Sequence, residues 1–237
     1  MNYRIADLSV NMQVGGRTLK QSEPFLVSET DDPNADINMF DIAERVVYAM
    51  EHTVSPKSDP DVVEYVVSGS RFYRLLVNFD GFMLHSSAVV LDDKAYLFSA
   101  DSGVGKSTHT KLWKERFENA YILNDDKPAL RIFEDEIYVY GTPWNGKSSE
   151  SVNKKVKLGG ICFLYRNDKN VIRKLTSSEA LQRLIRQTAQ RKFKRHTFEK
   201  LMGHWDKLLQ QCPIYEMGCL PDTEAVELAY QTMKGES

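Results

Sequence analysis

Long apolar runs, paired cysteines and low-complexity segments are all missing from this 237-residue sequence. No apolar stretch is long enough to cross a bilayer, so we expect no membrane association. The N-terminus lacks a cationic stretch followed by an apolar one, which predicts no secretory signal and a cytoplasmic protein. The three cysteines, Cys162, Cys212 and Cys219, lie far apart with no C-x-x-C pair, which favours reduced thiols over a disulfide or a zinc site.

The sequence also has no large excess of charge of one sign, because its net charge is only −2. Residues 1–80 carry 13 acidic and 7 basic side chains, a charge of −6, whereas the rest carry 20 and 24, a charge of +4. A mildly cationic second part suits a polyphosphate ligand. The excess is too small to predict nucleic-acid binding.

Turn-forming residues divide the chain into segments. The pattern of residues 3–14 and 24–28 predicts strands, that of 39–51 an amphipathic helix, and that of 55–61 a loop. We therefore expect a small N-terminal α+β region over 1–70, either separate or packed as part of the same domain, followed by a nucleotide-binding domain over 71–237. Strands are then predicted for 62–67, 70–78, 82–91, 94–99, 121–123, 128–133, 136–140, 156–165 and 213–218, and helices for 105–117, 177–190, 197–211 and 222–233.

A glycine-containing loop between a strand and a helix is the strongest motif. Residues 100–107 match A-x-x-x-x-G-K-S, a Walker A sequence with Ala in place of the first Gly. Glycines allow backbone N–H groups to converge on phosphate oxygens, and the helix that follows directs its N-terminus at the same anion. Lys106 could reach the β- and γ-phosphates, and Ser107 could offer its hydroxyl to Mg²⁺. The nucleotide-binding candidates are Ser102, Gly103, Val104, Gly105, Lys106, Ser107 and Thr108.

Two adjacent carboxylates follow the loop after 19 and 20 residues. A helix of about 12 residues can run away from the loop, and a short strand can return beside it. Asp125 and Asp126 would then divide two tasks, one carboxylate holding Mg²⁺ and the other taking a proton from an incoming hydroxyl. The competing interpretation is a solvated turn in which Lys127 neutralises the acids.

The strands around the loop do not alternate with helices, which predicts a mixed or antiparallel sheet. Together with the runs 84–90, 102–107 and 123–126, this pattern resembles the catalytic domain of HPr kinase/phosphorylase, in particular an uncharacterised bacterial branch that shares the run 141–147. The resemblance covers roughly residues 82–165. It implies an α+β fold with the phosphoenolpyruvate carboxykinase-type P-loop core, and a homo-oligomer, since the related kinases form rings.

The same resemblance implies an ATP- and Mg²⁺-dependent kinase that phosphorylates a hydroxyl, such as a serine of a protein or peptide. A histidine before the loop assists the catalytic aspartate in that family, and by position this is His85. Residues 1–80 do not match the family's N-terminal domain, so the acceptor stays open. Two rivals also stay open: an ATP-binding module with little turnover, and carboxykinase-like chemistry on a small molecule.

Weaker signals lie in a Pro/Gly loop and in a basic stretch. Lys147 could neutralise charge in a transition state, and Trp144 could stack on adenine or a substrate, but an ordinary turn anchored by Trp144 explains the loop equally well. The basic stretch 183–200 could hold an acidic peptide or the nucleotide, and a solvated helical face is its competing interpretation.

Overall fold

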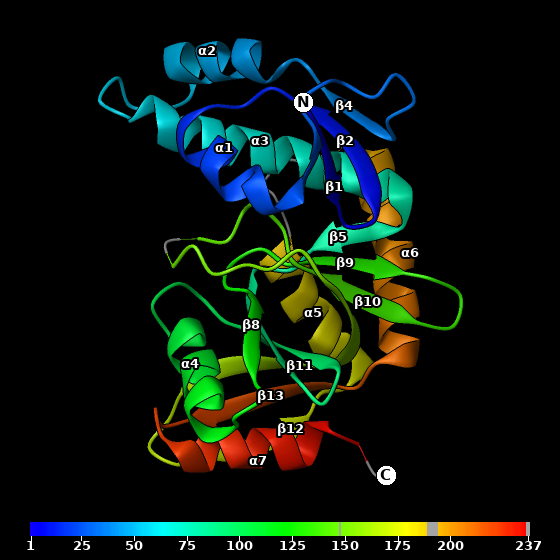
Figure 1. Cartoon of the computed structure of the whole chain (residues 1–237). Coiled ribbons are helices and arrows are strands. Elements are labelled where there is room, and N and C mark those ends of the chain that lie inside the picture. Colours follow the sequence, from blue (N-terminus) through cyan, green and yellow to red (C-terminus); the bar gives the residue numbers. More distant parts are fainter. Residues whose placement is uncertain (147, 189–193, 236–237) are drawn as a thin grey trace.

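A computed structural model describes residues 1–146, 148–188 and 194–235. The fold contains two β-sheets, one small and one large, and the helices pack around them (Figure 1). The helical elements are α1 (Gly16–Ser22), η1 (Glu23–Phe25), α2 (Ile42–His52), α3 (Pro60–Leu76), η2 (Val77–Phe79), α4 (Lys106–Arg116), α5 (Ser177–Thr188), α6 (Arg195–Gln211) and α7 (Thr223–Met233).

The small sheet has four strands in the order β3-β1-β2-β4. It lies with α1, α2 and α3 at one end of the molecule, and α7 lies at the other end (Figure 1). Its strands are β1 (Asn2–Ile5), β2 (Leu8–Met12), β3 (Leu26–Ser28) and β4 (Ile37–Met39).

The large sheet is mixed, as the sequence predicts. Its main path is β5-β9-β10-β11-β7-β6-β8, and β13 pairs with both β11 and β12. Strands β7, β11 and β13 are parallel neighbours, whereas the β6–β7 hairpin and the β9-β10-β11 meander are antiparallel. Its strands are β5 (Gly81–Met83), β6 (Ser86–Leu91), β7 (Lys94–Ser99), β8 (Tyr121–Asn124), β9 (Ala129–Ile132), β10 (Ile137–Tyr140), β11 (Lys155–Arg166), β12 (Val171–Lys174) and β13 (Ile214–Cys219).

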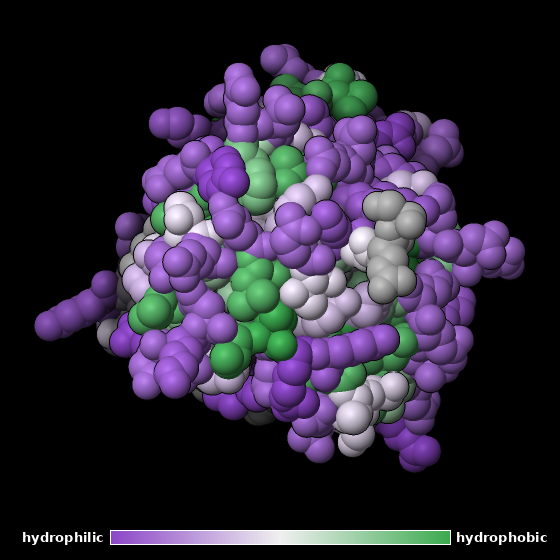
Figure 2. All heavy atoms as spheres, turned by 90° about the horizontal axis from the view of Figure 1, so that it is seen from below, coloured by the Kyte–Doolittle hydropathy of each residue, from purple (hydrophilic) through white to green (hydrophobic). Residues whose placement is uncertain are grey.

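Both faces of the large sheet are buried around its central strands, where alternate side chains pack in different cores. In β7, Leu97 packs on the side of α5 and α6 with Leu184 and Trp205. The next residue, Phe98, packs on the side of α4 and α7 with Trp113. This two-sided burial fixes β7, and therefore the loop that leaves its end. Seen from the α7 side, the surface is mostly hydrophilic with small apolar patches (Figure 2).

One pair of predicted elements is wrong. The sequence pattern predicted strands over 62–67 and 70–78, but α3 spans Pro60–Leu76 as one continuous helix. Its start is capped, since the Asp59 side chain accepts a hydrogen bond from the N–H of Asp61, and Pro60 occupies the first turn. The helix also runs across the predicted boundary at residue 70. None of the described helices is both long and apolar enough to cross a membrane.

Candidate functional site

The loop that follows β7 has the backbone that an anion site needs. Gly103 and Gly105 have φ angles of 79° and 126°, which L side chains rarely adopt. A Cβ atom built on either glycine would meet nothing within 4 Å, so the loop faces open space that a ligand could fill. Ala100 does not have a positive φ, which explains why alanine is tolerated at the first motif position.

The helix α4 begins at Lys106 directly after this loop. Its N-cap, Gly105, provides no side-chain hydrogen bond, so the first N–H groups of the helix stay open to an anion. The Lys106 side chain is buried, and its Nζ donates to the carbonyl oxygen of Ala100 at 2.9 Å. Burial lowers the pKa of Lys106, although the carboxylates of Asp126, Asp101 and Asp125 oppose that shift.

The predicted loop, acidic pair and histidine line one cavity of about 680 Å³, called here the loop cavity. It receives side chains or backbone from the ends of β7 and β8, from the start of α4, and from the segment before β6. Its lining consists of His85, Ser102, Gly103, Gly105, Lys106, Ser107, Thr108, Lys111, Asp125, Asp126, Gly146 and Ser148.

The side chain of Asp125 is fixed by a hydrogen bond from the neighbouring strand β6. Ser87 of β6 donates a hydrogen bond from Oγ to Asp125 Oδ1 at 2.7 Å. The same hydroxyl lies 2.8 Å from Thr110 Oγ1 on α4. This buried chain of hydroxyls connects α4 to Asp125 and leaves one carboxylate oxygen without these contacts.

Asp126 lies in a different environment and is about one-fifth exposed. Its Oδ1 lies 3.2 Å from His85 Nε2, and its Oδ2 accepts a hydrogen bond from Lys127. Burial alone would raise the pKa of Asp126, but the hydrogen bond from His85 and the charge of Lys127 outweigh it and lower the pKa to about 2. His85 is one-third exposed, so it is not a buried structural histidine.

The direction of the two aspartates depends on Asn124, to which the sequence assigned no role. Its Oδ1 accepts hydrogen bonds from the N–H groups of Asp126 and Lys127, which forms a side-chain-stabilised turn. Its Nδ2 donates to the carbonyl and hydroxyl oxygens of Thr142. Asn124 is fully buried, so the turn is anchored in the core rather than solvated.

A second unforeseen residue, Gln187 of α5, connects the loop to the histidine. Gln187 Nε2 donates to Asp101 Oδ1 at 3.1 Å, and its Oε1 lies 3.3 Å from His85 Nδ1. The backbone of His85 also donates to the carbonyl oxygen of Gln187 at 3.1 Å. Arg186 forms an ion pair with Asp101 at 2.5 Å. Part of the basic stretch therefore braces the loop, while residues 189–193 lie outside the described chain.

The Pro/Gly loop contributes a glycine rather than its tryptophan. Gly146 lines the loop cavity with a φ of 72°, and a Cβ there would lie 2.8 Å from Asp126 Cβ. Its N–H donates to the hydroxyl of Tyr65 on α3 at 2.9 Å. Trp144 is fully buried and donates from Nε1 to Ser68 Oγ at 3.1 Å, so the proposed stacking on adenine or substrate is wrong. Lys147 lies outside the described residues.

A second hollow of about 460 Å³ lies beside the same loop. It shares Gly103, Gly105 and Thr108 with the loop cavity, so the glycine loop separates the two spaces. Arg166, at the end of β11, donates to the carbonyl oxygen of Gly103 at 2.7 Å. The remainder of the lining is largely apolar and comprises Val104, His109, Leu164, Asn167, Cys219, Leu220 and Pro221.

The residues of the loop cavity fit a magnesium–triphosphate ligand. Within the described chain, no group of three or more His, Cys, Asp or Glu side chains could hold a metal ion by itself. Mg²⁺ at a phosphate loop takes few protein ligands, because phosphate oxygens and water complete its octahedron. One hydroxyl and one carboxylate on the same cavity wall, Ser107 and Asp125, are therefore a sufficient protein contribution.

Comparison with solved structures gives a distant likeness. No family model matches the chain, and no curated protein matches it. A solved structure of the Hpr(Ser) kinase/phosphatase from Coxiella burnetii is 12% identical, with 65% of this chain and 99% of that chain covered and a TM-score of 0.34. A likeness at this TM-score does not indicate a function.

Proposed function

We propose that this protein is an ATP- and Mg²⁺-dependent phosphotransferase that moves the γ-phosphoryl group to a hydroxyl, such as a serine of a protein or peptide. One observation carries the proposal: Lys106, Ser107, Asp125, Asp126 and His85 share the lining of a single cavity. These are the side chains that positioning, charge neutralisation and proton transfer require in phosphoryl transfer.

Each group has a distinct task in this proposal. The open N–H groups of the loop and of α4 bind the β- and γ-phosphates, and Lys106 turns from Ala100 to their oxygens. Mg²⁺, when bound, neutralises the phosphate charge and orients the γ-phosphoryl group. Ser107 and Asp125 would hold it, with Asp125 kept in place by Ser87.

Asp126 is the better candidate for the base, because it is more exposed than Asp125 and lies beside His85. It accepts the proton of the acceptor hydroxyl as the new P–O bond forms and the bond to the leaving ADP oxygen breaks. A pKa of about 2 makes Asp126 a weak base, which suits a carboxylate that orients the hydroxyl and receives its proton late.

The second hollow offers a place for the nucleoside. It adjoins the loop on the side away from Asp125 and Asp126, which line only the loop cavity. Apolar walls such as Val104 and Leu164 suit the faces of a base. With the base there, the triphosphate would pass over Gly103 and Gly105 and bring its γ-phosphate to the aspartates.

The test compares Lys106→Ala with Asp126→Asn. We expect Lys106→Ala to stay folded and to lose about tenfold or more in ATP·Mg affinity, measured by calorimetry, because a charged phosphate contact is removed. Asp126→Asn should retain binding within a few-fold and lose about 100-fold or more in transfer of labelled phosphate to lysate proteins. Unchanged ATP binding and turnover in Lys106→Ala would refute the site.

The same assays separate the rivals. A protein that binds ATP·Mg but labels no protein, peptide or small alcohol would be a binding module instead. ATP consumption that depends on oxaloacetate would indicate carboxykinase-like chemistry. Equal losses of binding and rate in Asp126→Asn would argue against its role as the base.

A further inference from the structure

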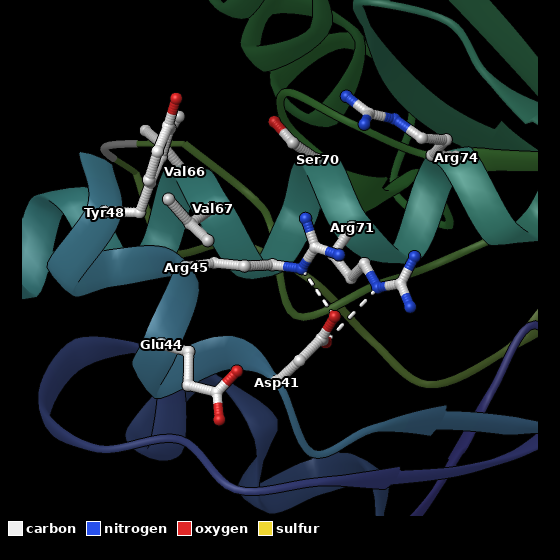
Figure 3. A pocket seen from close by; sticks show the side chains of 9 residues that line it. All are labelled: Asp41, Glu44, Arg45, Tyr48, Val66, Val67, Ser70, Arg71 and Arg74. Atoms are coloured by element: carbon white, nitrogen blue, oxygen red, sulfur yellow. Dashed lines mark hydrogen bonds and ion pairs between the residues drawn. The ribbon is translucent and has the colours of Figure 1, made fainter. Parts of the chain in front are cut away.

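A groove on the N-terminal region lies between α2 and α3 and has a volume of about 500 Å³ (Figure 3). It is separate from the loop cavity, with which it shares no lining residue. Its lining consists of Asp41, Glu44, Arg45, Tyr48, Val66, Val67, Ser70, Arg71 and Arg74, and is called here the α2–α3 groove.

Exposed apolar side chains are frequent in the segment that forms this groove. Of the fourteen large apolar side chains that are exposed in the described chain, six lie within residues 40–66. Two of the six, Tyr48 and Val66, line the groove itself and are 61% and 56% exposed. Exposed apolar side chains that line a common groove mark contacts with another molecule, whereas scattered single residues do not.

The groove also presents three guanidinium groups. Asp41 pairs with two of them, through Arg45 Nε at 2.6 Å and Arg71 Nε at 3.3 Å. Each guanidinium has five N–H donors, so most of their donors remain for a further ligand. The exposed side chain of Arg74 joins none of the ion pairs found among the described residues, and Glu44 is directed away from the guanidiniums (Figure 3).

The face of α3 that lines the groove is the one that the core leaves free. Val66, Ser70 and Arg74 recur every four residues and form one stripe along the helix. The opposite stripe is buried: Phe72 stacks on Trp144 with ring centroids 4.9 Å apart, and Tyr65 contacts Gly146. The groove therefore lies on a helix whose other face supports the loop cavity.

We propose that the α2–α3 groove docks an acidic, amphipathic segment of a partner protein. Apolar side chains of that segment would pack on Tyr48 and Val66, and its carboxylates would pair with the guanidiniums of Arg71 and Arg74. The lining carries three positive and two negative charges, in a region of 80 residues whose charge is −6. This local reversal of sign favours an acidic peptide over a basic one, and docking requires no phosphoryl transfer.

The experiment selects ligands without assuming their sequence. A displayed library of random peptides is enriched on the wild-type protein and counter-selected on Arg74→Glu, a variant of an exposed residue. We expect enriched sequences that combine Asp or Glu with Leu, Phe or Ile. One such peptide, labelled with fluorescein, should bind in anisotropy titrations about fivefold or more weakly to Arg74→Glu and to Val66→Asp, and more weakly at higher salt.

The matched control is Lys207→Glu, a charge reversal at an exposed position of α6, which should bind the peptide like the wild type. Circular dichroism checks that all variants are folded. Enrichment of basic sequences, or of no consensus, overturns the proposal, as does binding that Arg74→Glu and Val66→Asp leave unchanged. A dimer in ultracentrifugation that Val66→Asp dissociates, or binding to phosphatidylserine vesicles that Arg74→Glu abolishes, would assign the groove to a second copy or to a lipid surface instead.

Discussion

At the scale of single residues, the contacts of Gln187 orient the ring of His85. A carboxylate can only accept, so the amide nitrogen of Gln187 faces Asp101, and its oxygen faces His85 Nδ1 at 3.3 Å. The other ring nitrogen, Nε2, lies 3.2 Å from the carboxylate of Asp126. Gln187 therefore positions the ring of His85 against Asp126.

Replacing Gln187 by leucine should lower the rate of phosphoryl transfer about tenfold, because His85 loses the contact that orients its ring toward Asp126. Transfer of labelled phosphate measures the rate, and calorimetry measures the affinity for ATP·Mg, which should stay within a few-fold of the wild type. Gln182→Leu, at an exposed glutamine on the same helix, is the control. Equal losses of rate and affinity would indicate a purely structural role.

The pKa of Asp126 predicts a second, independent effect on stability. Its folded value of about 2 lies below its ordinary value of 3.8, so its ion pairs stabilise the fold above pH 4. That stabilisation is lost as the pH falls through the folded pKa. The free energy of unfolding should fall by about 2 kcal/mol through this one group. Urea titrations between pH 6 and 2 should therefore show a steeper loss for the wild type than for Asp126→Asn, and parallel curves would contradict the assignment.

At the scale of elements, the sequence predicted the parts whose signals are local. The strand over 94–99, the helix that begins near residue 105 and the strand over 121–123 all appear where predicted, since each depends on neighbouring residues. The helix α3 was missed because Val62, Val63, Val66 and Val67 favour strands. Asp59 and Pro60 are typical of a helix start, but they lie within the loop predicted for 55–61.

Other parts of the site had no local signal to find. Gly146 lines the cavity, and Tyr65 and Gln187 contact its lining residues Gly146 and His85. The three come from distant segments, and their spacing along the chain encodes none of these contacts. The resemblance around residues 141–147 marked the right loop but the wrong side chain. The sequence is compatible with either an exposed or a buried Trp144. The side chain is buried because it packs against the apolar face of α3.

Gly146 is the element-scale position most open to test. A methyl group there combines an unfavourable φ with a contact 2.8 Å from Asp126 Cβ, so the aspartate must move. We expect Gly146→Ala to lose about tenfold or more in transfer rate and roughly 1 kcal/mol of stability. Gly203→Ala is the matched control, because Gly203 lies in α6 with open space around it. Its stability should stay the same or rise by up to about 1 kcal/mol in the urea titration.

At the scale of the whole molecule, the N-terminal region and the loop cavity share a core. One apolar cluster joins Tyr3 and Phe25 with Ala129, Tyr140 and Trp144 of the main domain. Contact there is close, since a Cβ on Gly69 of α3 would lie 2.8 Å from the Trp144 ring. The predicted division at residue 70 therefore crosses both a helix and a hydrophobic core.

The three tryptophans make this coupling measurable, because each belongs to a different core: Trp205 to the α5–α6 side, Trp113 to the α4–α7 side and Trp144 to the N-terminal side. Variants that keep one tryptophan and replace the others by phenylalanine report the unfolding of one core each. A ligand at 100 times its Kd should raise the free energy of unfolding by about 2.7 kcal/mol for every part of the protein that unfolds together with the ligand's site. We expect ATP·Mg to raise the urea midpoint of all three reporters alike. A Trp144 midpoint that does not change with the nucleotide would show that the N-terminal region unfolds separately, since Trp144 is fully buried in the core of that region.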